Sequence, residues 1–254
     1  MAALIKEAGF PPGVINVLSG HGAVSGAVLS SHMDVRALSF TGSGRTGRLI
    51  TKAAADSNLK KVTLELGGKS PNIVFPDADL ESAAEGTQYS IQWNSGQVCM
   101  ANSRIYVEES AAERFVDLFK AKFGAVKAGD PTDGKVDHGP LADEAQFKTV
   151  SGYLQLGQES GAQRILGDEQ GDEGSLTVAP TVFTNAPEGS RIMKEEVFGP
   201  VVVINTFRSE EEVLKKANDT EYGLYASVYT KDLDRAMRCA KALESGYVGV
   251  NCTR

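Results

Sequence analysis

Cys99 stands in a polar, glycine-containing stretch at residues 93–104, where a thiol could do chemistry. Loops of this kind present side chains to a cleft, and the thiolate form of cysteine is a strong nucleophile. A cysteine is more often a small core side chain, and we interpret Cys239 so, because it shares the apolar side of a predicted helix with Ala236 and Ala240. Cys252, near the end of the sequence, is interpreted as structural or exposed. Cys99 is the candidate nucleophile.

A cysteine hydrolase would need a histidine to hold the thiolate, and the sequence offers only His21, His32 and His138. His32 precedes a turn, and His138 follows the polar run at residues 133–137. We interpret all three as surface or structural residues. A cysteine esterase without a cofactor is the alternative, and it predicts ester cleavage that depends on Cys99 but not on added nucleotide.

A glycine-rich turn precedes this region and fits the pattern G-x-G-x-x-G between a predicted strand and a predicted helix. Its residues are Gly42, Ser43, Gly44, Arg45, Thr46 and Gly47. Backbone amides at such a turn can hold a pyrophosphate, although a plain strand-to-helix turn has the same pattern. In a standard dinucleotide fold an acidic residue about 20 positions later binds the ribose hydroxyls. Glu65 stands near that place, so a dinucleotide-binding module with Glu65 on the ribose is a further alternative.

Composition narrows the classes of protein. The 254 residues are 41% hydrophobic and 23% charged, which is typical of a globular protein with one large core or two smaller ones. A net charge of -7 without long charged runs disfavours nucleic acids and anionic membranes as partners. No apolar stretch approaches the ~18 residues of a membrane span, and the start does not resemble a secretory signal. Three widely spaced cysteines match no zinc or disulfide pattern, so we expect no metal and a reducing, cytoplasmic location.

Short β-rich runs alternate with helical patterns, which predicts an α/β architecture. Residues 35–41, 46–57 and 61–66 form a predicted strand-helix-strand unit with parallel strands. Further helices are predicted at 110–124, where Ser110 and Glu113 suggest a capping box, and at 142–158, 209–217 and 232–245. Further strands are predicted at 105–107, 201–207, 225–229 and 247–251. The character of the sequence changes near residue 67, where we place a domain boundary.

Four segments resemble, in order, the signature segments of aldehyde dehydrogenases. They are Phe40-Thr41-Gly42-Ser43, Leu64-Glu65-Leu66-Gly67-Gly68-Lys69-Ser70-Pro71, Asn94-x-Gly96-Gln97-x-Cys99-x-Ala101-x-Ser103-Arg104 and Glu195-Glu196-Val197-Phe198-Gly199-Pro200. Weaker similarity fills the gaps, so that the resemblance covers essentially the whole sequence. It implies a partial Rossmann-like cofactor domain at residues 1–66 and an α/β catalytic domain at residues 67–254, incomplete at its C-terminal end.

The resemblance also implies a mechanism. The Cys99 thiolate would add to the aldehyde carbon, the Cys99 backbone amide would hold the oxyanion, and oxidation by NAD or NADP would leave a thioester. Glu65 would then activate the water that hydrolyses the thioester to a carboxylic acid. Because relatives that transfer the acyl group to coenzyme A commonly lack this base, Glu65 favours hydrolysis. This assignment replaces the ribose role for Glu65.

Further site residues follow from the resemblance. The glycine turn, with Ser43, would lie near the cofactor phosphates, Glu196 would bind the nicotinamide ribose, and Leu66 and Phe198 would also contact the cofactor. Without the following Phe-Gly-Pro, Glu196 would be interpreted as a solvated acidic residue. Three residues flanking the nucleophile are assigned to the substrate tunnel, with an ordinary core role as the alternative: Trp93, Val98 and Met100.

The resemblance begins inside the family's cofactor domain and stops before its C-terminus. Family members are usually homo-oligomers, and the segments that join their subunits have no counterpart here. Missing parallel strands would leave unpaired edges, and a missing oxyanion donor would cost ~10²- to 10³-fold in rate. An inactive fragment or truncated protein is therefore the main alternative to an enzyme that oxidises a small-molecule aldehyde with NAD or NADP.

Overall fold

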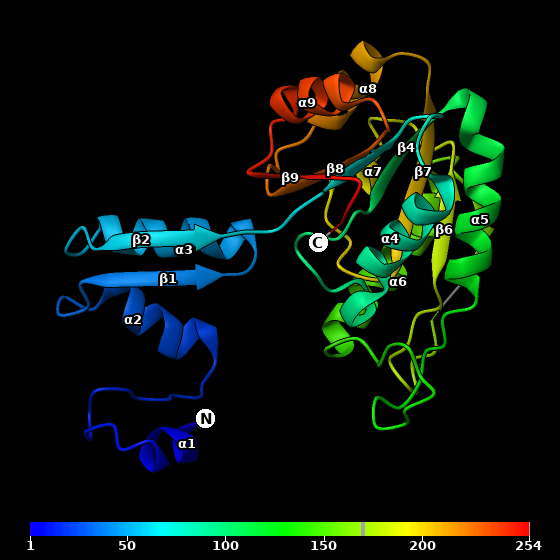
Figure 1. Ribbon diagram of the computed structural model, residues 1–254. Coiled ribbons are helices and arrows are strands. Elements are labelled where there is room, and N and C mark those ends of the chain that lie inside the picture. The colour runs from blue at the N-terminus through cyan, green and yellow to red at the C-terminus, as the bar shows by residue number, and fades with distance from the viewer. Residues whose placement is uncertain (169–170, 254) are drawn as a thin grey trace. The chain divides into compact units, whose positions relative to one another are not determined.

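The computed structural model describes residues 1–168 and 171–253 (Figure 1). The chain divides into two compact units, a first unit at Met1–Leu66 and a second unit at Gly67–Arg254. Each unit has its own sheet. None of the described helices is both long and apolar enough to cross a membrane.

The first unit is built around a strand-helix-strand motif, with β1 (Ala37–Thr41), α3 (Gly44–Ala55) and β2 (Lys61–Glu65). The two strands are parallel, as predicted, and their register runs from Ala37 opposite Lys61 to Thr41 opposite Glu65. Gly47 lets α3 pack closely on the sheet end, because a Cβ there would lie 2.8 Å from Leu66 Cδ2. Preceding elements are α1 (Ala2–Glu7), a π-helical turn (Gly22–Gly26) and α2 (Ala27–Ser31).

The second unit contains a seven-stranded sheet within the described residues, in the order β5-β6-β7-β4-β3-β8-β9. Neighbouring strands are parallel except β5, which runs antiparallel to β6 at the edge. The strands are β3 (Pro71–Val74), β4 (Arg104–Glu108), β5 (Gln163–Leu166), β6 (Thr181–Thr184), β7 (Val201–Phe207), β8 (Tyr225–Tyr229) and β9 (Tyr247–Val250). The central strands are almost entirely buried, which is typical of a parallel sheet covered on both faces.

Helices cover both faces of this sheet and create two cores. One core lies under α4 (Leu80–Gln92) and α5 (Ala112–Gly124), where Phe115, Phe119 and Phe123 recur at helical spacing. The other core lies under α6 (Glu144–Glu159), α7 (Arg191–Lys194), α8 (Glu210–Asn218) and α9 (Leu233–Ala242). Cys239 of α9 is fully buried in the second core, which confirms its interpretation as a core residue, and Cys252 is exposed.

The α/β class is confirmed, but several local predictions need correction. The capping box at Ser110 is wrong: residues Glu109–Ala111 form a 3₁₀ turn, α5 begins at Ala112, and the Ser110 hydroxyl donates to Glu108 instead. The last predicted helix was too long, since Leu243 is extended and buried. Sequence reasoning also missed α4 and the four-residue strands β3, β5 and β6.

Candidate active site

The amino ends of three neighbouring parallel strands bring the signature segments of the second unit together. Lys69 and its preceding glycines lead into β3, the cysteine loop leads into β4, and the segment ending at Pro200 leads into β7. Because β3, β4 and β7 are parallel and adjacent, their amino ends lie at one edge of the sheet. Three segments far apart in sequence therefore meet there.

The cysteine loop turns through three consecutive left-handed residues, Asn94, Ser95 and Gly96, with φ of 50°, 57° and 73°. Two of them carry side chains, for which this conformation is unfavourable, so tertiary contacts must hold the loop. The Ser95 hydroxyl donates to the carbonyl of Gly139 at 2.7 Å, and the Asn94 side-chain amide donates to the carbonyl of Gln97 at 3.1 Å. Cys99 emerges from this turn half-buried.

Val98 and Met100, which flank the nucleophile, are also half-buried, whereas Trp93 is 59% exposed at the end of α4. An exposed tryptophan next to a loop held in an unusual conformation fits a surface that contacts a ligand better than a core position. The tunnel role of these three residues stays a prediction.

Glycines allow the three segments to touch. A Cβ on Gly68 would collide with the carbonyl oxygen of Cys99, and one on Gly67 would collide with the Glu196 carboxylate. A Cβ on Gly96 would collide with the carbonyl of Gly199. These positions require glycine because backbone approaches backbone or carboxylate directly.

For the aldehyde oxidation that the resemblance implies, we expect Gly68→Ala to lower the rate by about 10²-fold, because the methyl group would displace Cys99, and a small misplacement of a reacting group can cost that much. The measurement is kcat/KM for an aldehyde, together with the melting temperature. Gly152→Ala is the matched control, since nothing lies within 4 Å of a Cβ at that helical position. Equal activity of the two variants would contradict the role of Gly68.

Arg104 anchors this edge of the sheet. Its side chain is buried and donates to the carbonyls of Lys69 at 2.9 Å, Lys216 at 3.2 Å and Ala217 at 2.8 Å. The last two carbonyls belong to the final turn of α8, where helix carbonyls lack partners within the helix. One guanidinium thus fixes the strand after the cysteine loop, the segment before β3 and the end of a helix.

The carboxylate of Glu196 lies against Gly67 and Gly68. Its Oε1 accepts a hydrogen bond from the Gly68 backbone at 2.9 Å. Burial raises the pKa of Glu196, while the Gly68 amide and Lys69 act in the opposite direction. Burial, with Arg104 nearby, lowers the pKa of Lys69 to about 7. A carboxylate with a raised pKa and an amine with a lowered pKa therefore lie together at this edge of the sheet.

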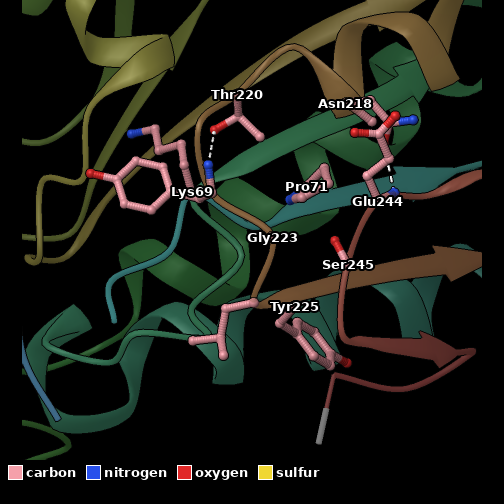
Figure 2. Close-up of a pocket in the computed structure, with 11 residues that line it drawn as sticks. Lys69, Pro71, Asn218, Thr220, Gly223, Tyr225, Glu244 and Ser245 are labelled. Carbon is pink, nitrogen blue, oxygen red and sulfur yellow. Dashed lines mark hydrogen bonds between the residues drawn. The ribbon is translucent and has the colours of Figure 1, made fainter. Parts of the chain in front are cut away.

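A narrow cavity lies beside the same edge, lined by residues that include Lys69, Thr220, Gly223, Glu244 and Ser245 (Figure 2). The Thr220 hydroxyl accepts a hydrogen bond from the Tyr222 backbone amide at 3.2 Å, which makes a local turn in the loop before β8, and both residues line the cavity. Lys69, which had no role in the sequence-based prediction, connects the cavity to the glycine segment. Its only signal in the sequence was its position inside the Leu64–Pro71 motif.

The glycine turn and Glu65 belong to the first unit. Within that unit, Ser43 caps α3: its hydroxyl accepts from the Thr46 backbone at 3.3 Å. The Gly42 amide donates to the Glu65 carbonyl at 3.0 Å, which joins the turn to the end of β2. Glu65 is exposed.

His138 is buried, and neither ring nitrogen has a hydrogen-bond partner. It therefore holds no thiolate, which disfavours the cysteine-histidine alternative. Its neighbour Gly139 accepts the hydrogen bond from Ser95, so His138 lies in the loop that supports the cysteine turn.

Burial lowers the pKa of His138 below its ordinary value of 6.5, although Asp137 acts in the opposite direction. As pH falls through that ordinary value, the unfolded chain binds a proton that the folded chain refuses, so stability is lost. We expect the free energy of unfolding, measured with urea, to fall below about pH 6.5 in the native chain and less so in His138→Gln. His32→Gln, at an exposed position, is the control; identical pH dependence in all three chains would contradict this prediction.

Comparison with known proteins places these features in one family. The aldehyde dehydrogenase family model matches residues 1–254. The chain is 49% identical to cytosolic aldehyde dehydrogenase 1 of Rattus norvegicus over 252 residues, which are 99% of this chain and 50% of that protein. It is 50% identical to an aldehyde dehydrogenase of Davidiella tassiana over 251 residues, which are 98% of this chain and 50% of that protein.

Solved structures with the same fold are also aldehyde dehydrogenases. The indole-3-acetaldehyde dehydrogenase of P. syringae, in complex with NAD+ and IAA, superposes with a TM-score of 0.96 at 43% identity, over 99% of this chain and 51% of that one. Lactaldehyde dehydrogenase from Escherichia coli gives a TM-score of 0.96 at 38% identity, over 99% of this chain and 53% of that one. The chain spans about half the length of these proteins.

Relatives include cytosolic and mitochondrial forms, so a cytoplasmic location stays a prediction. The chain belongs to the aldehyde dehydrogenase family.

Proposed function

We propose that this chain carries the nucleophile and the hydrolytic base of an NAD(P)-dependent oxidation of an aldehyde to a carboxylic acid. In this proposal Met1–Leu66 is the C-terminal part of the cofactor-binding domain, and Gly67–Arg254 is the catalytic domain. The observation that carries the proposal is the contact of Gly68 with the Cys99 carbonyl and with Glu196, which joins the nucleophile's loop to the two neighbouring signature segments.

The residues present fit the nicotinamide end of such a cofactor. Gly67 and Gly68 let the Glu196 carboxylate and the Cys99 carbonyl lie directly against this backbone, and the Gly68 amide donates a hydrogen bond that fixes Glu196 there. Phe198 is 37% exposed, so its ring has a face available for packing. For the phosphates of the cofactor, the amino terminus of α3, which is capped by Ser43, offers backbone amides.

The chemistry would start at the sulfur. The Cys99 thiolate would form a bond to the aldehyde carbon, and the Cys99 backbone amide would stabilise the resulting oxyanion. The nicotinamide would supply the acceptor for the hydride that leaves this carbon, so that the C=O bond re-forms and a thioester on Cys99 remains. Glu65 would then take a proton from water, the water oxygen would attack the thioester carbon, and the carbon-sulfur bond would break to release the acid and the thiolate. An aldehyde dehydrogenase with this base releases acid rather than transferring the acyl group.

The test is to incubate the purified chain with NAD or NADP and a panel of aldehydes, following reduced cofactor at 340 nm by absorbance and the acylated Cys99 peptide by mass spectrometry. Reduced cofactor and an acyl adduct on Cys99 are expected. An absence of both, in a chain that binds apolar dyes strongly, would favour the alternative that the chain does not catalyse by itself.

A further inference from the structure

One face of α6 contacts the segment that contains Glu196 and Phe198. Gln146, Val150 and Tyr153 are spaced by four and three residues, so they share one side of the helix. Val150 packs against Gly199, where a Cβ would lie 2.7 Å from Val150 Cγ2. The helix thus lies directly on residues 195–199.

Gln146 binds the backbone of this segment. Its side-chain amide donates to the carbonyl of Phe198 at 2.8 Å and to that of Val197 at 3.3 Å. Phe198 has a φ of 58°, in the left-handed region that a residue with a side chain avoids. Such a conformation persists only where neighbouring groups determine it, and Gln146 supplies two hydrogen bonds to it.

Tyr153 binds the other end of the segment. Its hydroxyl donates to Glu195 Oε2 at 2.6 Å, and Arg191 donates to both oxygens of the same carboxylate at 2.9 and 2.8 Å. Arg191 also lowers the pKa of Glu195, so this carboxylate is charged and remains with its partners. Glu196 lies between the two anchored points.

We propose that Gln146 is a positioning residue that holds Phe198 in its left-handed conformation, so that the Phe198 ring and the Glu196 carboxylate keep the orientation needed at the nicotinamide. The inference rests on the proposed function. The role requires a donor, because both groups that Gln146 contacts are carbonyl oxygens. Tyr153 performs the equivalent task for Glu195 from the same helix face.

Two reactions of one active site separate positioning from general stability. Hydrolysis of a p-nitrophenyl ester requires the Cys99 thiolate and the water activated by Glu65, but no cofactor. Aldehyde oxidation requires, in addition, the orientation of Glu196 and Phe198. A residue that positions only the nicotinamide end will therefore change the ratio of the two rates, whereas a residue that merely stabilises the fold will not.

The experiment measures both rates for the native full chain, Gln146→Ala, Gln146→Glu and Gln155→Ala. Gln155 is the matched control, because it is exposed on the same helix and its amide donates to Glu159. For Gln146→Ala we expect kcat for oxidation to fall about tenfold or more, with ester hydrolysis and melting temperature close to native. Equal loss of both rates, or no loss of oxidation, would overturn the positioning role.

Gln146→Glu keeps the shape but replaces the donor by a carboxylate, which repels the two carbonyls when ionised. Its protonated form donates one hydrogen bond, so the ratio of its oxidation rate to that of the native chain should rise as pH falls from about 8 to about 5.5. A ratio that does not change with pH would contradict the need for a donor. If the native chain hydrolyses esters but oxidises no aldehyde under any condition, the proposed function fails instead.

Discussion

Replacing Cys99 by alanine is expected to lower aldehyde oxidation by at least about 10⁴-fold, which is the scale seen when an enzyme loses its nucleophile. The sulfur forms the only covalent bond to the substrate in the proposed mechanism, so no neighbouring group can take over its part. The loop around Cys99 should keep its shape, because Ser95 and Asn94 hold it through contacts that do not use the thiol. The measurement is reduced cofactor formed per chain, with ester hydrolysis as a second readout.

Cys252→Ala is the matched control, since this cysteine is exposed. It should retain native rates. Retention of oxidation in Cys99→Ala would remove Cys99 from the mechanism. Loss of oxidation in Cys252→Ala would show that the loss of activity does not by itself identify Cys99 as the nucleophile. Ester hydrolysis that persists in Cys99→Ala would point to a different nucleophile.

Glu65→Gln is expected to stop the reaction after the aldehyde has been oxidised to a thioester on Cys99 and before the thioester is hydrolysed. The thiolate can still add to the aldehyde and become a thioester, but the water that hydrolyses it lacks a base, and such proton transfers contribute about 10²- to 10⁴-fold. We therefore expect a rapid burst of about one reduced cofactor per Cys99, followed by a steady rate lower by that factor. Stopped-flow absorbance measures the burst, and mass spectrometry measures the trapped acyl group.

This variant also separates the two roles of Glu65 that the residues alone leave open. If Glu65 bound the cofactor ribose, Glu65→Gln would weaken cofactor binding and would not accumulate acyl enzyme. Glu211→Gln, exposed on α8, is the control for loss of a surface charge. A native steady rate in Glu65→Gln would contradict its role as the base.

The candidate site of the second unit lies at the amino ends of its parallel strands. Ligands of open parallel sheets usually bind at the carboxyl ends of the strands. Here Lys69, Cys99 and Pro200 all precede their strands, so the second unit builds its part of the site at the amino ends of β3, β4 and β7. Main-chain groups at that edge are held by Arg104 and by glycine contacts rather than by a helix amino terminus.

Much of the fold follows from local patterns. Residues 201–207 and 225–229 were predicted as strands and form β7 and β8 with the same bounds, because both are rich in β-branched or aromatic residues and both lie inside a buried sheet. The four-residue strands β3 and β6 escaped prediction, since so short a run shows no period of its own. Helix α4 escaped because its buried face consists largely of small or polar residues such as Ala83, Ala84 and Thr87, which give a weak apolar pattern.

The sequence by itself determined the chemistry available to this protein: one cysteine in a polar loop, one glutamate before two glycines, and the order of the family segments that contain them. The tertiary structure alone decided which side chains bind which backbone groups. Gly68 and Glu196 are 128 positions apart, and Gln146 and Phe198 are 52 positions apart, yet each pair shares a hydrogen bond. Local periodicity cannot encode such pairs, because they form only when strands and helices from distant parts of the chain pack together.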